Sequence, residues 1–231
     1  MTNKNIPEDL QWAIKLQKQR ELEQSYPEVD YESLEELTLY HGTTTKYLDK
    51  ILSKGIFPRK LLQENTNGNW SKDPSNPFMV YLTSAYAPYF ADVAANKNGG
   101  KPVVLEVKVD KFNLYPDEDY LEQATREDPE WQKKFRGQDM SQRTKFFVQK
   151  FMAYKDFYTE SLKHMGTACY LGGINSEQIT RYSILDHSKI IDFFDPTITI
   201  QNFRFLGNRY RMLSDLDTWK QPLSEEVIVK C

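Results

Sequence analysis

Cysteine is scarce in this 231-residue sequence, and long apolar runs are missing. Cys169 and Cys231 provide neither a disulfide framework nor the paired spacing of a metal site. No apolar stretch approaches the roughly 20 residues that cross a bilayer, and the first residues lack the apolar core of a signal peptide. These absences favour a soluble cytoplasmic protein with no membrane partner.

Several other signatures are also missing. Among the three histidines, neither His164 nor His187 belongs to a cluster of cysteines and carboxylates at ligand spacing, so no metal is expected. No glycine-rich phosphate loop follows a strand, which argues against a hydride-transfer enzyme. The 30 basic and 33 acidic residues give a net charge of -3, which implies no global attraction to nucleic acid.

The pattern that is present predicts one globular domain, residues 37–231, preceded by an N-terminal helical arm, residues 1–36. Thr43, Thr44 and Thr45 are placed to cap a short helix, and Gly55 is placed to end it. A second, small-residue helix is expected over 84–95. Strands are expected at residues 37–41, 78–83, 103–109, 167–171, 179–184 and 189–194.

A polar helical insertion is expected around residues 116–160. Its acidic run at 117–119 is interpreted as solvated, whereas its aromatic stripe at helical spacing is interpreted as core packing rather than as a base-stacking surface. Arginines and aromatic residues alternate at 203–211. That cluster is interpreted as a basic edge strand, with a nucleic-acid surface as the alternative.

Three apolar segments each deliver one polar residue that bears on chemistry. His41 follows Leu39-Tyr40, Tyr81 lies within Val80–Thr83, and Glu177 precedes Ile179. If the segments are neighbouring strands, the three side chains can converge in one cleft, because side chains alternate between the faces of a strand. The sequence therefore predicts a site at these positions.

In order and spacing these motifs resemble the ADP-ribosyltransferase superfamily, in its His-Tyr-Glu branch of diphtheria-toxin-like and poly(ADP-ribose)-polymerase-like enzymes. The resemblance covers residues 37–195. It implies an α+β fold of two packed, mostly antiparallel β-sheets with flanking helices and an NAD cleft between the sheets. It also implies NAD+ as the co-substrate, with its nicotinamide–ribose bond broken.

The resemblance assigns catalytic roles to three residues. Glu177 would stabilise the developing oxocarbenium charge and accept a proton from an acceptor hydroxyl. His41 would hydrogen-bond the ribose, and Tyr81 would stack on the nicotinamide ring. Gly42 would leave its backbone open to the carboxamide, and Thr43 completes this NAD+-binding motif.

The remaining cofactor-binding positions lie around the second motif. Tyr89 would close the other face of the nicotinamide ring, with Tyr86 as the competitor for that role. Thr83 and Ser84 would orient the ring amide. Arg59 would reach the pyrophosphate as a bidentate partner, with a solvated arginine at the helix exit as the alternative.

We therefore expect a mono-ADP-ribosyltransferase of the toxin or effector type, whose acceptor is a protein or a nucleic acid and whose partners include an antitoxin or inhibitor protein. Asn175 stands where arginine-modifying relatives carry a second Glu or Gln, which argues against an arginine acceptor. An NAD+ glycohydrolase and an inactive NAD- or ADP-ribose-binding module are the alternatives, because fold does not guarantee chemistry.

Overall fold

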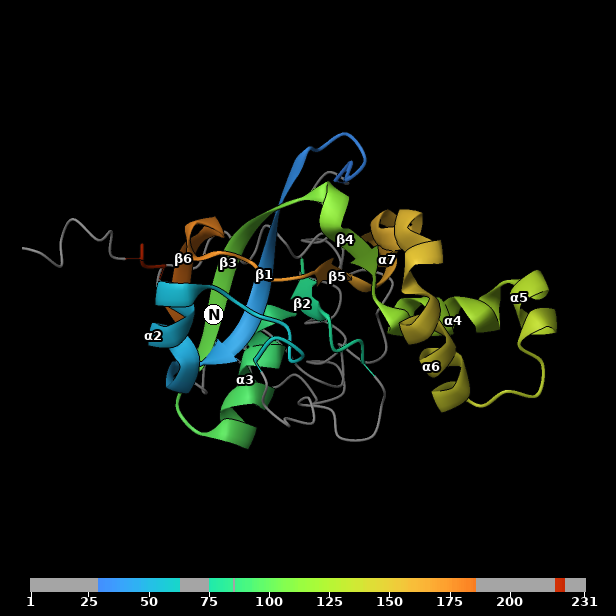
Figure 1. The fold of residues 1–231 in the computed structure, drawn as a ribbon, viewed down its shortest axis with the longest axis horizontal. Helices are drawn as coiled ribbons and strands as arrows, with labels where there is room; N and C mark the ends of the chain where they lie inside the picture. Colours follow the sequence, from blue (N-terminus) through green and yellow to red (C-terminus); the bar gives the residue numbers. More distant parts are fainter. Residues whose placement is uncertain (1–28, 63–74, 85, 186–218, 223–231) are drawn as a thin grey trace, which may run out of the picture.

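The structure, a computed structural model, describes residues 29–62, 75–84, 86–185 and 219–222. These residues form an α+β fold with helices around an antiparallel sheet (Figure 1). The strands are β1 (Glu36–Thr44), β2 (Met79–Thr83), β3 (Pro102–Asp110), β4 (Leu114–Pro116), β5 (Thr167–Leu171) and β6 (Ile179–Ile184). The α-helices are α2 (Thr45–Lys54), α3 (Ala87–Asn98), α4 (Glu118–Glu127), α5 (Pro129–Lys134), α6 (Met140–Lys150) and α7 (Tyr158–Met165). The 3-10 turns are η1 (Lys111–Asn113), η2 (Phe151–Phe157) and η3 (Ser176–Gln178).

Much of the predicted local structure is confirmed. Both β5 and β6 have the predicted bounds, and β1 starts one residue earlier than expected. Thr44 caps α2 and Gly55 ends it, as the spacing predicted. Most of the predicted arm, the strand at 189–194 and the arginine cluster at 203–211 lie outside the described residues.

The expectation of two packed sheets is corrected by the strand order. The described strands form one six-stranded sheet in the order β4-β5-β2-β1-β3-β6. Strand pairing is sparse in the middle of the sheet, because β1 and β2 share a single registered pair, Tyr40 and Thr83. By contrast, β1 pairs with β3 along its whole length, from Glu36 to Thr44. The sheet thus consists of two three-stranded halves that meet at one seam, the β1–β2 seam.

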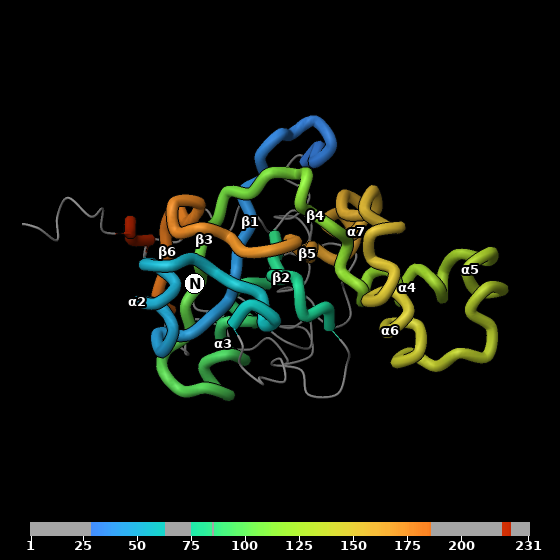
Figure 2. The backbone as a smooth tube through the Cα atoms, viewed as in Figure 1, coloured from blue at the N-terminus to red at the C-terminus, as the bar shows by residue number. Residues whose placement is uncertain are grey.

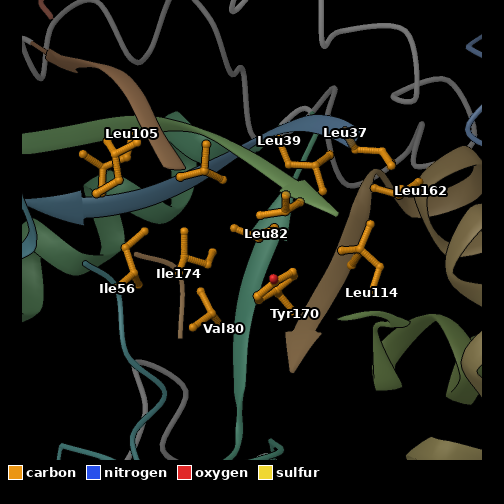
Figure 3. Packing of buried hydrophobic residues seen from close by; sticks show 14 of the residues in the cluster. Leu37, Leu39, Ile56, Val80, Leu82, Leu105, Leu114, Leu162, Tyr170 and Ile174 are labelled. Atoms are coloured by element: carbon orange, nitrogen blue, oxygen red, sulfur yellow. The ribbon is translucent and has the colours of Figure 1, made fainter. Parts of the chain in front are cut away.

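One core lies against one face of both halves (Figure 3). Leu39 and Leu105 from one half and Leu82 and Tyr170 from the other belong to the same buried cluster. Each fully buried aliphatic side chain of this cluster contributes on the order of 2 kcal/mol to the free energy of unfolding. The two halves are therefore held together mainly by shared apolar packing rather than by ladder hydrogen bonds.

The opposite face of the sheet carries α3, and Gly42 makes that packing possible. Tyr40 and Val104 cluster there with Ala87 and Ala91 of the helix. A Cβ atom at Gly42 would lie 2.4 Å from the Ala91 nitrogen and 2.5 Å from the Ala87 carbonyl oxygen. The missing side chain thus admits the backbone of α3 on this face of the sheet.

Two further features position the candidate site. The connection from β5 to β6 crosses the core face of the sheet, where Ile174 pairs with Ile56 (Figures 1 and 2). Beyond β4 the chain enters a helical lobe, defined here as residues 118–157, and α7 returns it to β5. Within the described ranges no helix combines the length and apolar character needed to cross a bilayer.

The aromatic stripe lies in this lobe and packs as predicted. Phe147 is fully buried against Leu121 and Phe135, and Trp131 stacks on it with ring centroids 5.6 Å apart. The stripe does not run along one helix, because α6 ends at Lys150 and the backbone kinks at Tyr154. Core packing, rather than base stacking, therefore explains these rings.

Replacement of Gly42 tests the close packing of α3. We expect Gly42→Ala to lower the free energy of unfolding by about 3 kcal/mol or more, because the new methyl group meets helix backbone that cannot move aside. Urea denaturation measures this. Gly173→Ala is the control, since its Cβ would press mainly on the exposed Phe57 ring, and equal losses for both variants would contradict the assignment.

Candidate functional site

His41 lies at the β1–β2 seam and bridges it. Its Nδ1 is 3.0 Å from the backbone carbonyl oxygen of Tyr81. A carbonyl oxygen can only accept a hydrogen bond, so Nδ1 carries the proton and Nε2 presents a lone pair. Burial lowers the pKa of His41, although the bond to Tyr81 opposes that shift. The imidazole is therefore neutral at pH 7, and its Nε2 can accept a hydrogen bond from a hydroxyl group.

Tyr81 is held by its hydroxyl group as well as by β2. The hydroxyl donates to Glu118 Oε1 and accepts from the backbone N–H of Asn76 at 2.7 Å. Burial raises the pKa of Tyr81 well above its ordinary value, and the neighbouring Cys169 and Glu118 add to the shift. The phenol therefore stays protonated, and it ties the seam to the first turn of α4.

Two buried carboxyl groups lie beside Tyr81, and they correct the expectation of a solvated acidic run. Asp117 and Glu118 are only 8% and 6% exposed. Burial raises the pKa of each to about 7, and for Asp117 the nearby Glu118 adds to the effect. Asp117 also caps α4, accepting from the Asp119 N–H at 3.0 Å. The run was missed because its one sequence signal, an Asp before a helix, also fits a solvated cap.

The same two carboxyls, with Cys169, are the group in the described part of the chain that could offer a metal three ligands. Their ligand atoms lie within 4.8 Å of one another. Both Glu118 oxygens already accept hydrogen bonds, from the Tyr81 hydroxyl and, at 3.8 Å, from the Cys169 thiol. Burial also raises the pKa of Cys169 well above its ordinary value. A protonated hydrogen-bond network therefore accounts for the arrangement.

Thr83 and Ser84 lie at the end of β2, but their hydroxyls are already used. Thr83 Oγ1 donates to the Gly166 carbonyl at 2.7 Å and accepts from the Tyr86 N–H at 2.8 Å. The Ser84 hydroxyl also donates to Gly166, at 3.4 Å. Both residues are fully buried, so they join β2 to Gly166 and are not directed toward a ligand amide.

The two candidate tyrosines of α3 differ in exposure. Tyr86 is buried at the start of the helix, whereas Tyr89 is exposed on its first turn. Both rings contact Phe90 edge-on. A ring that closes over a ligand must be accessible, so exposure favours Tyr89 over Tyr86.

Thr43 and Arg59 have structural surroundings of different kinds. Thr43 is buried on β1 opposite Val103. Arg59 Nη2 donates to the Ser75 carbonyl at 2.9 Å and to its hydroxyl oxygen at 2.5 Å. Lys60 N–H donates to the Pro77 carbonyl beside it. Arg59 therefore joins the segment after α2 to the segment that leads into β2.

Glu177 is the predicted residue that the structure does not bring beside Tyr81. It is exposed on η3, just before β6. Across the sheet, one row of paired residues consists of His41, Leu105 and Tyr182. A second row consists of Leu39, Val107 and Ile179. Glu177 therefore lies beyond that second row, on the far side from His41. Its neighbours Ile174 and Ile179 both pack in the core cluster, which places it by the same face of the sheet as the β5–β6 connection.

The buried carboxyls predict a pH-dependent stability. In the folded chain the pKa of each carboxyl is about 7, which is above its value in an unfolded chain. Their protonated forms therefore contribute fully to the free energy of unfolding below about pH 4, and this contribution is lost as the pH rises to about 7. Glu118→Gln should flatten this decline in the free energy of unfolding by about 3 kcal/mol at most, since one pKa unit corresponds to about 1.4 kcal/mol. Urea titrations at several pH values measure the slope. The exposed Glu130→Gln is the control, and an unchanged slope in Glu118→Gln would refute the assignment.

Comparison with known proteins adds little to this geometry. No family model matches the chain. No curated protein matches it. The solved structure of EcPltA is similar over 66% of this chain and 79% of that chain, with 13% sequence identity and a TM-score of 0.36. A similarity at this level supports no assignment, so the functional interpretation depends on the residues themselves.

Proposed function

We propose that this chain is a mono-ADP-ribosyltransferase that cleaves the nicotinamide–ribose bond of NAD+ and transfers ADP-ribose to a protein or nucleic-acid acceptor. The observation that carries the proposal is the meeting of His41 and Tyr81 at the seam. These two residues come from separate motifs of the sequence, and the His41 ring bonds the Tyr81 backbone there. A neutral histidine with an accepting Nε2 suits a ribose hydroxyl, and the Tyr81 ring, which lies on the other face of β2 with Met79 and Cys169, is the proposed partner of the nicotinamide.

In the proposed arrangement NAD+ lies along the seam between the two halves of the sheet. His41 Nε2 accepts a hydrogen bond from a ribose hydroxyl. Tyr81 and the exposed Tyr89 flank the nicotinamide ring, and Arg59, which already binds Ser75, is the proposed partner of the pyrophosphate. Thr83 and Ser84 act indirectly, by fixing the end of β2 near Gly166.

Glu177 is the proposed carboxylate for the chemical step, although the strand register places it beyond the Leu39–Val107–Ile179 row, away from His41. Departure of nicotinamide leaves positive charge on the ribose, which an ionised carboxylate stabilises, and the same group can remove a proton from the acceptor hydroxyl. Its exposure keeps it accessible to an acceptor. Glu118 is the competing carboxylate, because it lies at Tyr81, but it is buried and its raised pKa of about 7 keeps a large fraction protonated.

The proposed acceptor is a macromolecule, in keeping with a toxin or effector that an antitoxin or inhibitor protein would restrain. Two alternatives use the same NAD+ site. A glycohydrolase would use water as the acceptor, and a binding module would hold NAD+ or ADP-ribose without chemistry. They differ from the transferase in the products formed.

The first test incubates the purified protein with NAD+ labelled in its adenylate part and with cell extract, followed by separation of protein, RNA and DNA. We expect label in one macromolecular fraction and a loss of about 100-fold or more in Glu177→Ala, the scale of a general base. Glu118→Gln is the matched carboxylate control and should retain transfer. The reverse pattern would move the catalytic role to Glu118.

The remaining outcomes of that test separate the alternatives. Nicotinamide release without label transfer would identify a glycohydrolase. Thermal protection by NAD+ with no consumption would identify a binding module.

A second test separates the ring of Tyr81 from its hydroxyl group. Tyr81→Phe keeps the ring and should leave NAD+ affinity within a few-fold of the parent, while the lost hydrogen bond to Glu118 lowers the free energy of unfolding by about 1 to 2 kcal/mol. Tyr81→Ala should weaken NAD+ binding by about tenfold, because stacking contributes on the order of 1 kcal/mol. Isothermal titration measures the affinity.

Tyr170→Phe provides the control for that test. It removes a similar tyrosine–carboxylate bond, to Asp110 at 2.7 Å, from the core face. Equal NAD+ affinity in Tyr81→Ala and the parent would show that the ring has no part in binding.

A further inference from the structure

The helical lobe contains a pocket of about 260 Å³ that lies apart from the seam. It is formed where the end of α4, α5 and the turn before α6 come together. Its lining residues are Thr125, Arg126, Gln132, Phe135, Arg136, Gly137, Gln138 and Arg143. The polar side chains among them are guanidinium, amide and hydroxyl groups, and no carboxylate lines the pocket.

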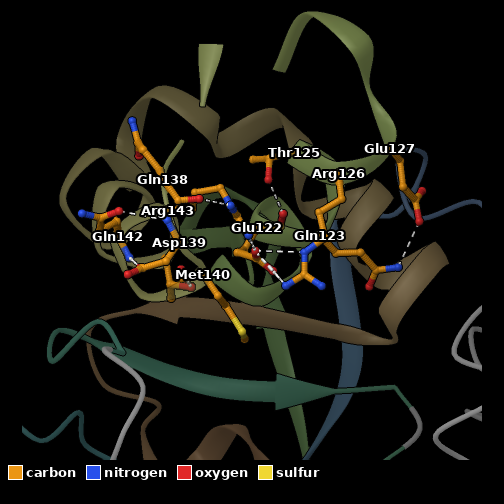
Figure 4. Close-up of polar contacts among 11 residues, drawn as sticks. Glu122, Gln123, Thr125, Arg126, Glu127, Gln138, Asp139, Met140, Gln142 and Arg143 are labelled. Atoms are coloured by element: carbon orange, nitrogen blue, oxygen red, sulfur yellow. Dashed lines mark hydrogen bonds and ion pairs between the residues drawn. The ribbon is translucent and has the colours of Figure 1, made fainter. Parts of the chain in front are cut away.

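Glu122 holds two of the arginines that line the pocket, Arg126 and Arg143 (Figure 4). Its side chain is only 3% exposed. It accepts from Arg126 Nη2 at 2.7 Å and 2.9 Å and from Arg143 Nη2 at 2.5 Å. Arg126 and Arg143 therefore share one buried carboxylate, which leaves the group with one excess positive charge.

The arginines differ in what they can still bind. Arg143 uses its Nε and Nη2 on Glu122 and its Nη1 on the Gln138 carbonyl, so it forms a fixed wall. Arg126 uses Nε and Nη2, and its Nη1 makes no hydrogen bond to any described residue; its side chain is 54% exposed. Arg136 is exposed and has no ion-pair or hydrogen-bond partner for its guanidinium in the described ranges.

We propose that this pocket binds a phosphate group, held by the Arg136 guanidinium and by Arg126 Nη1. Two guanidinium groups offer planar, charged N–H pairs that match phosphate oxygens, and charge-assisted bonds of this type are the strong ones. Glu122 holds Arg126 in place before a ligand arrives, which reduces the entropy lost on binding. The volume is large enough for a phosphate with part of an attached sugar.

The site is separate from the proposed NAD+ site and does not depend on ADP-ribose transfer. Arg126 and Arg136 belong to the helical lobe, whereas His41 lies in the sheet, at the β1–β2 seam. The lobe extends from the β4 edge of the sheet (Figure 1). The phosphate can be free in solution or part of a nucleic-acid strand, and both present the same oxyanion.

The experiment titrates the full chain with inorganic phosphate, in the absence of NAD+ and at constant ionic strength, and follows binding by calorimetry. We expect saturable binding that Arg136→Ala weakens about tenfold and Arg136→Glu abolishes, as for the loss of a charged hydrogen-bond pair. Because Arg136 is exposed and unpaired among the described residues, both variants should keep the thermal midpoint of the parent. Lys145→Ala, an exposed cation on α6 outside the pocket lining, is the matched control.

A competition arm identifies the source of the phosphate. Short RNA with a 5′-phosphate, and the same RNA with a 5′-hydroxyl, are added to the phosphate complex. Displacement by the first alone indicates a terminal phosphate, displacement by both indicates the strand's phosphodiesters, and displacement by neither indicates free phosphate. Absence of saturable phosphate binding, or an equal effect of Arg136→Ala and Lys145→Ala, would overturn the proposal. Glu177→Ala should bind phosphate normally, so failure of transfer and failure of this site are distinguishable.

Discussion

The hydrogen bond from Tyr81 to Glu118 is the interaction on which the arrangement of this molecule depends. Tyr81 lies on β2, at the seam between the halves of the sheet, and Glu118 begins α4, the first helix of the lobe. The same carboxyl accepts a hydrogen bond from the thiol of Cys169, on β5. A single buried group thus joins the seam, the neighbouring strand and the lobe. Because an unpaired buried hydroxyl or carboxyl is costly, none of the three can shift independently.

Two carboxyls one turn apart on α4 illustrate how local partners decide the state of a buried acid. Glu118 has a phenol, a thiol and another acid nearby, and no cation among the described residues bonds to it. Burial therefore favours its protonated form. Glu122 is equally buried but lies between Arg126 and Arg143, whose hydrogen bonds compensate the loss of water. The first holds the sheet, and the second orders an electropositive pocket.

Local patterns in the sequence were sufficient for α2 and for every described strand except the three-residue β4, because alternation and a Thr cap act over a few residues. They were insufficient for the acidic run at Asp117 and Glu118, whose burial depends on Tyr81, 37 residues away from Glu118. Gly42 shows the same limit. A missing side chain predicts a close approach, but it does not identify the backbone of α3 as a group that approaches. Likewise, no period in the sequence reveals that the Thr83 hydroxyl is bound to Gly166.

The seam explains how His41 can combine a structural role with the chemical role proposed for it. Since β1 and β2 share one registered pair, the carbonyl of Tyr81 depends on a partner other than a regular ladder, and the His41 ring supplies it. That bond fixes the tautomer, so Nε2 carries the accepting lone pair. The two roles are compatible, because the ring that completes the seam is the ring for which we propose a hydrogen bond to a ribose hydroxyl. A substitution that keeps only a donor to the carbonyl would preserve the first role and remove the second, so loss of activity at position 41 without loss of stability would separate them.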